Sequence, residues 1–128
     1  MKKTIKAIYI NVSNEDGARV IDLCPSLAEY YRLIDCDCID IAYRKIGGEH
    51  YDIICDDEGL LKASPKVSAI DSNFHPALVG NLIVCKPDGY GDETSLTDDD
   101  VTNILAHVLR VNTLAHPRGY KMLVGVDY

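Results

Sequence analysis

The fold is decided by Cys55-Asp56-Asp57-Glu58-Gly59-Leu60-Leu61, Gly80-Asn81-Leu82-Ile83-Val84-Cys85 and Ser95-Leu96-Thr97-Asp98-Asp99-Asp100-Val101. The first stretch is an acidic turn that ends in glycine, which is typical of a reversal between two strands. The second is an apolar run that predicts a central strand. The third places a threonine N-cap before three aspartates, which favours the start of a helix. Together they indicate an α+β fold, and none of them has a catalytic spacing.

The N-terminal part predicts a hairpin followed by a short helix. Apolar residues recur at every second position from Ile8 to Val12, and the same pattern resumes after a turn at 14–17. Ser26 and Glu29 have the spacing of a capping box, so we expect a helix over Leu27–Ile34.

The middle of the chain predicts a meander of strands. Cys36 and Cys38 begin one strand, residues 51–55 pair back, and Leu60-Leu61 follows the acidic turn. Residues 64–73 predict a covering loop, residues 78–85 one central strand, and residues 86–91 a second loop.

The last part predicts the longest helix and a terminal strand. Thr97 caps this helix, an apolar stripe runs along it from Val101 to Ala115, and Pro117 ends it. Alternating apolar residues from Tyr120 to Tyr128 then predict a strand that pairs with an edge, either in its own sheet or in a neighbour's.

We therefore expect one α+β domain over residues 1–117. It contains a mostly antiparallel sheet of about five or six strands, with a short and a long helix packed on it. Residues 118–128 form a strand-like tail, which we expect to act as an oligomerisation element in a homodimer.

Composition and charge restrict the partners and the compartment that the protein can have. The chain has 128 residues, is 47% hydrophobic and carries a net charge of −7. This charge disfavours direct binding of nucleic acid and of other acidic partners, and it leaves a basic partner open. The odd count of five cysteines, the absence of a signal-peptide pattern and the lack of an apolar run of about 20 residues predict a reduced cytoplasmic protein without a membrane span.

Catalytic and metal sites find little support in the sequence. Cys36 and Cys38 lack the knuckle spacing of a structural zinc site, so we expect no metal, and no motif calls for a cofactor. Asp98 to Asp100 suit a helix N-terminus on stability grounds alone. A hydrolase would have to use His75, in an Asn-Phe-His-Pro loop, with a cysteine, although no local signature joins them.

An anion site is the remaining candidate. On the outward face of the predicted long helix, Asn103, His107 and Arg110 recur at helical spacing and can hydrogen-bond or carry positive charge. Arg44 and Arg118 are further candidates, with tyrosines as stacking partners. The alternative interpretation is an ordinary solvated face.

The chain resembles a small family of uncharacterised proteins carried by phages, plasmids and conjugative elements, sometimes encoded near antirestriction genes. The resemblance rests on the order of four stretches within the first 105 residues, and the tail after Arg118 departs from it. The four stretches are 30–41, 56–61, 73–84 and 96–101.

The resemblance implies a non-enzymatic accessory protein of a phage or mobile element that binds a host factor, with counter-defence as one role. A second hypothesis is a protein that sequesters a small anionic ligand such as a nucleotide. The small hydrolase using His75 and a cysteine is a third.

The cysteine pattern yields a first prediction. Thiol titration of the denatured chain should return all five cysteines, and metal analysis should find no stoichiometric zinc, because the spacing builds no tetrahedral site. One equivalent of bound zinc would contradict it.

Overall fold

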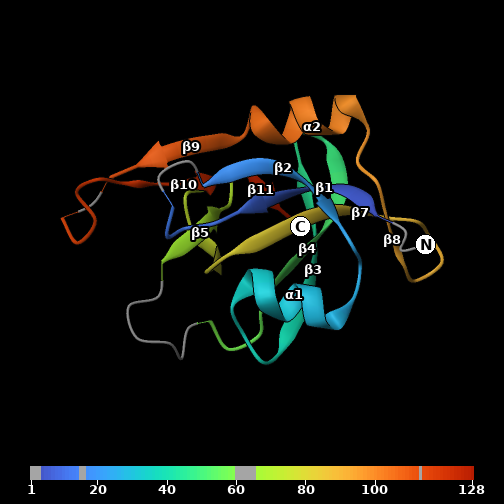
Figure 1. The fold of residues 1–128 in the computed structure, drawn as a ribbon. Helices are drawn as coiled ribbons and strands as arrows, with labels where there is room; N and C mark the ends of the chain where they lie inside the picture. The colour runs from blue at the N-terminus through green and yellow to red at the C-terminus, as the bar shows by residue number, and fades with distance from the viewer. Residues whose placement is uncertain (1–3, 15–16, 60–65, 113) are drawn as a thin grey trace.

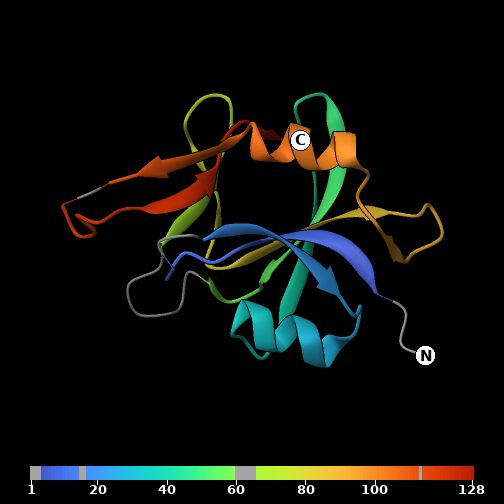
Figure 2. The same cartoon turned by 45° about the horizontal axis from the view of Figure 1, so that its top comes forward.

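The computed structural model describes residues 4–14, 17–59, 66–112 and 114–128, and within them two helices and eleven strands. All eleven described strands belong to a seven-stranded sheet or to a smaller four-stranded sheet. Figure 1 shows helix α1 on one side of the large sheet and helix α2 on the other. Figure 2 shows the small sheet on the same side as α2. The predicted α+β class is confirmed, but the strands are more numerous than five or six.

Every described strand pair of the large sheet is antiparallel. Its order is β11-β3-β4-β7-β1-β2, and the short strand β8 pairs with the far end of β7. In that order the strands span Val126–Asp127, Ile39–Ile46, Glu49–Asp56, Leu82–Pro87, Ile5–Ile10 and Ala18–Leu23, and β8 spans Glu93–Thr94.

The small sheet has the order β6-β5-β10-β9. Its strands span Pro76–Val79, Val67–Ile70, Tyr120–Leu123 and Val108–Val111. The β5–β10 pair is parallel and its other two pairs are antiparallel. β5 lies where the sequence predicted a loop, so that prediction was wrong, and residues 60–65, which include Leu60-Leu61, lie outside the described residues.

Two apolar cores lie on the two faces of the large sheet. Period-two alternation along the central strands divides them: Ile53 and Val84 enter the core beneath α2 and the small sheet, whereas Ile54 and Ile83 enter the core beneath α1. All four side chains are fully buried. The sheet is therefore the middle layer of the domain.

Helix α1 spans Leu27–Ile34 as predicted, and Ser26 caps it by accepting a hydrogen bond from the Glu29 amide. Helix α2 spans only Asp98–Leu105, so the prediction of a long helix to Pro117 was wrong. The chain turns at Ala106 and His107 and continues as β9, because β-branched Val108 and Val111 pair with β10.

Two predicted strands are each divided in two. The expected strand 78–85 is broken at Gly80, whose φ of +78° suits glycine, and this break sends β6 and β7 into different sheets. The terminal strand is interrupted after Leu123, so β10 joins the small sheet and β11 joins the large one. Both tail strands thus pair within their own chain.

The N-cap of α2 yields a second prediction. The Thr97 hydroxyl accepts a hydrogen bond from the Asp100 amide at 3.1 Å, and the Asp100 carboxylate in turn accepts one from the Thr97 amide at 2.9 Å. Thr97→Ala should lower the free energy of unfolding by about 1 kcal/mol, measured by urea denaturation. Thr102→Ala in the same helix is the matched control and should leave stability nearly unchanged, since Thr102 is exposed.

Candidate functional site

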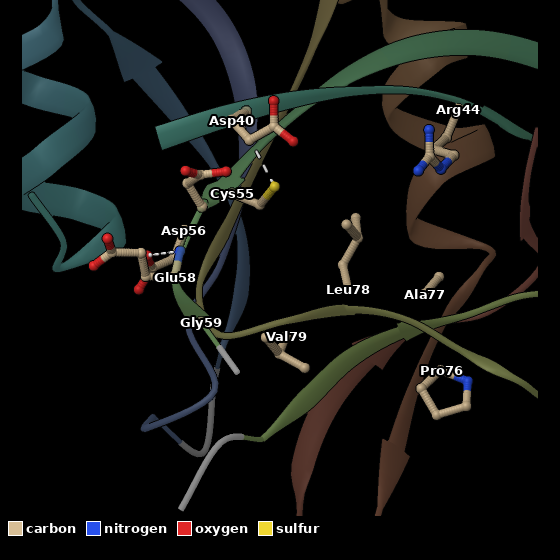
Figure 3. Close-up of a pocket in the computed structure, with 11 residues that line it drawn as sticks. Asp40, Arg44, Cys55, Asp56, Glu58, Gly59, Pro76, Ala77, Leu78 and Val79 are labelled. Carbon is tan, nitrogen blue, oxygen red and sulfur yellow. Dashed lines mark hydrogen bonds between the residues drawn. The ribbon is translucent and has the colours of Figure 1, made fainter. Parts of the chain in front are cut away.

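The candidate site is a groove of about 350 Å³ between the ends of β3 and β4 and the strand β6 (Figure 3). We call it the β6 groove. Acidic side chains gather on one side of it, and the Leu78 side chain of β6 projects between them and Arg44. The lining residues are Asp40, Arg44, Cys55, Asp56, Asp57, Glu58, Gly59, Pro76, Ala77, Leu78 and Val79.

The acidic turn after β4 is held by local hydrogen bonds. The Asp56 carboxylate accepts a hydrogen bond from the Glu58 amide at 2.9 Å, and the Asp57 amide donates to the Cys38 carbonyl at 3.0 Å. A Cβ at Gly59 would lie 2.5 Å from the Val79 side chain, so only glycine lets the turn approach β6 this closely. The turn signal in the sequence therefore positions the carboxylates at the groove.

The Cys55 thiol in this groove is held in its protonated form. Burial, followed by the nearby Asp40 carboxylate, raises the pKa of Cys55 to about 12, so the thiol stays protonated at neutral pH. Its Sγ donates to the Asp40 carbonyl at 3.6 Å. Burial also raises the pKa of Cys85 above its ordinary value.

Arg44 is the one cation among the described residues that line the β6 groove. Its guanidinium carbon lies 4.1 Å from the centre of the Tyr128 ring, a cation–π contact that holds the arginine beside the tail. Of the residues predicted for anion binding, Arg44 alone lies in this groove.

The other predicted anion-binding residues are not brought together on a helix face. Asn103 points inward and donates hydrogen bonds to the Ile46 carbonyl at 2.9 Å and to the Tyr51 hydroxyl at 3.0 Å. His107 lies just beyond α2, and its Nδ1 bonds the Asn103 carbonyl at 2.8 Å. Arg110 is on β9, and Arg118 precedes β10. The prediction of an outward-facing set was wrong, because the helix ends at Leu105.

Sequence reasoning missed the polar network to which Asn103 belongs. The Asp100 carboxylate is buried and accepts hydrogen bonds from the Tyr51 hydroxyl at 2.9 Å and the Lys86 ammonium at 3.1 Å, in addition to those from Thr97. Burial opposes its charged form, but these hydrogen bonds outweigh burial and hold the pKa of Asp100 below its ordinary value. The network is structural. Its only sequence signal was the aspartate three residues after Thr97.

The structure also shows where the residues of the hydrolase hypothesis lie. His75 lies in the exposed turn between β5 and β6, and its Nδ1 is 3.7 Å from the Asp71 carboxylate. The five cysteines are free thiols, and Cys36 and Cys38 lie in the α1–β3 connection and not on a strand as predicted. Within the described residues, no group of three or more histidines, cysteines or carboxylates could hold a metal ion.

Comparison with known proteins places the chain among proteins of unknown function. The model of the domain of unknown function DUF3846 matches residues 5–109. The chain belongs to this family. The DUF3846 match covers all four stretches on which the resemblance rested, and it ends within β9, before the tail strands. No curated protein and no solved structure is detectably similar to the chain. In the described part of this DUF3846 protein, no helix is long and apolar enough to cross a membrane.

The Asp100 network yields a third prediction. Because the folded pKa of Asp100 is lowered, its stabilising contribution is complete above the ordinary aspartate pKa of about 4 and is lost as the pH falls through the folded value. Asp100→Asn should therefore destabilise the protein at pH 7 by about 2 kcal/mol and by much less at pH 2. Asp99→Asn, an exposed neighbour on the same helix, is the control. Equal losses at both pH values would contradict this assignment.

Proposed function

We propose that this protein is a non-enzymatic binding protein that holds a basic, extended segment of a partner protein in the β6 groove. The observation that carries the proposal is the lining of that groove, where the carboxylates of Asp40, Asp56, Asp57 and Glu58 stand beside the apolar side chains of β6. A segment that alternates basic and apolar side chains matches both parts of this lining.

The position of β6 adds support. It is an edge strand of the small sheet, so an incoming segment would lie beside it by strand addition, with main-chain hydrogen bonds supplying affinity. Alternate side chains of that segment would then reach the carboxylates and the apolar floor. The net charge of −7 would also speed the approach of a basic partner.

The chemistry of the thiols favours binding over catalysis. A cysteine hydrolase needs a thiolate beside a base, whereas the Cys55 thiol is protonated at neutral pH and His75 lies on an exposed turn. We further propose, in line with the resemblance to mobile-element proteins, that the partner is a host protein and the role counter-defence in the cytoplasm. Association as a homodimer would use an edge strand such as β9, where Leu109 is 54% exposed.

Sequestration of a small anionic ligand is the second candidate. A separate pocket of about 460 Å³ brings together Lys66, His116 and Arg118, beside Ser13 and Asn14. The charges of Lys66 and Arg118 suit a phosphate or carboxylate group, to which the His116 ring could add a hydrogen bond. Stabilisation by nucleotides, measured as a rise in the melting temperature that Arg118→Gln removes, would favour this function over the first.

The β6 groove yields a fourth prediction. A fluorescent peptide that alternates arginine and leucine should bind the protein, and Asp40→Asn combined with Glu58→Gln should weaken binding about tenfold, since each charge contributes roughly 0.5–1 kcal/mol. Fluorescence anisotropy at low and high salt measures this, and added salt should weaken the wild type more than the variant.

The matched control is Asp22→Asn, which removes an exposed carboxylate on the edge strand β2 and should leave affinity within about twofold. Equal weakening by Asp22→Asn would mean that binding depends on net charge and not on the groove. Failure of the peptide to bind at all would overturn the proposal.

A further inference from the structure

A second groove, of about 430 Å³, lies on the opposite face of the large sheet, between the start of α1, strand β3 and the β7–β8 connection. We call it the α1 groove. The α1 groove is independent of the β6 groove. Side chains at odd positions of β3, such as Ile41, face the α1 groove, whereas Asp40 and Arg44 face the β6 groove. The lining residues are Ile5, Pro25, Ser26, Leu27, Tyr30, Ile41, Asp88, Gly91, Asp92 and Glu93.

Glu93 is the unusual member of this lining. It lies on β8 opposite Pro87, so its side chain falls on the same face of the sheet as Cys85. Asp52 on β4 is the register partner of Cys85. The carboxyl groups of Asp52 and Glu93 therefore meet beside a fully buried thiol. Glu93 Oε2 is buried and has no hydrogen-bond partner among the described residues.

No positive charge compensates this carboxyl from the groove. The described lining contains no lysine, arginine or histidine. The titratable groups that face Glu93 are Asp52 from β4, Cys85 from β7, Asp88 from the β7–β8 connection and Tyr30 from α1, and none of them is cationic. The hydrogen-bonding groups beside the Glu93 carboxyl are the Asp52 carboxyl and the Cys85 thiol, and neither of them carries a positive charge. A partly buried carboxylate without an opposite charge is costly, so either a proton or an external cation must neutralise it.

We propose that the α1 groove binds the ammonium or guanidinium group of a lysine or arginine side chain on a partner protein, and that Glu93 is the carboxyl that pairs with it. The apolar residues beside it suit the methylene stem of such a side chain, since Leu27 is 58% exposed and Ile41 is 46% exposed. An inorganic cation would leave this apolar lining unused.

Binding should be coupled to loss of a proton. Burial, then the Asp52 carboxyl, raises the pKa of Glu93 to about 7, so near neutral pH the site exchanges its proton for a cation. A bound ammonium favours the charged carboxylate and lowers this pKa again. Affinity for a cationic side chain should therefore increase as the pH rises through 7.

The test uses Nα-acetyl-lysine methylamide, whose side-chain ammonium is free, as the probe. Its uncharged analogue, Nα-acetyl-norleucine methylamide, is the matched control. Titration into ¹⁵N-labelled protein should shift amide resonances at the start of α1 and at β8. The dissociation constant of the lysine probe should be roughly tenfold lower at pH 8.5 than at pH 5.5, the ratio produced by a change of one pKa unit on binding. Equal binding of the norleucine probe, or no pH dependence, would overturn the proposal.

Two variants test whether the pH-dependent binding of the lysine probe depends on the Glu93 carboxyl. Glu93→Gln should remove the pH dependence and weaken the lysine probe about tenfold at pH 8.5, whereas Asp92→Asn, an exposed carboxylate on the same groove, should keep the pH dependence. Loss of pH dependence in both variants would show that general charge is responsible and would overturn the role of Glu93. The Asp40→Asn, Glu58→Gln protein should still bind the probe here, so failure of one groove is distinguishable from failure of the other.

Thermal unfolding shows whether Glu93→Gln still folds. The folded pKa of Glu93 lies above its unfolded value, so the wild type loses stability as the pH rises from about 4.5 through 7. The variant should lack this loss and melt no lower than the wild type at pH 8. Binding of Mg²⁺ at these residues without binding of the lysine probe would identify an inorganic cation site and would also overturn the proposal.

Discussion

The buried Asp100 carboxylate is the constraint on which the arrangement of α2 and the small sheet over the large sheet depends. It joins the first turn of α2 to the large sheet through Tyr51 on β4 and Lys86 on β7. Removing a carboxylate from water is unfavourable unless hydrogen bonds replace its solvation, and here several donors do so. The Tyr51 hydroxyl also accepts a hydrogen bond from the Asn103 side-chain amide, which in turn donates to the last carbonyl of β3. One acid thus fixes the helix, two strands and the turn between β3 and β4.

That turn shows how closely the network is packed. A Cβ at Gly47 would come within 2.1 Å of the Asn103 side-chain oxygen, so glycine is required where the helix meets the turn. With α2 held in place, the chain can enter β9 and complete the small sheet. The small sheet in turn places β6 opposite the acidic turn after β4, and this arrangement creates the β6 groove.

Both proposed binding sites follow from the alternation of side chains along β3. Asp40 and Arg44 face the β6 groove, and Ile41 faces the α1 groove. Each site combines carboxylates with apolar surface, so both suit basic side chains with long methylene stems. They differ in electrostatics: the carboxylates of the β6 groove stand at an open turn, whereas Glu93 stands against Asp52 in a partly buried position. A basic partner would therefore meet a salt-dependent site on one face and a pH-dependent site on the other.

The sequence by itself determined the elements whose signals are local: the N-terminal hairpin, helix α1, the caps at Ser26 and Thr97, and the acidic turn at 56–59. Caps and turns depend on a few adjacent residues, so their chemistry can be read without the rest of the chain. Tertiary structure decided where α2 ends, that Gly80 divides a strand between two sheets, and that Asn103 points inward. It also brought Glu93 beside Asp52. An apolar residue fits either a helix stripe or a strand, and a carboxylate becomes unusual only through neighbours distant in sequence. No local pattern encodes pairing between distant segments, and this pairing therefore determined where these elements end and which residues meet.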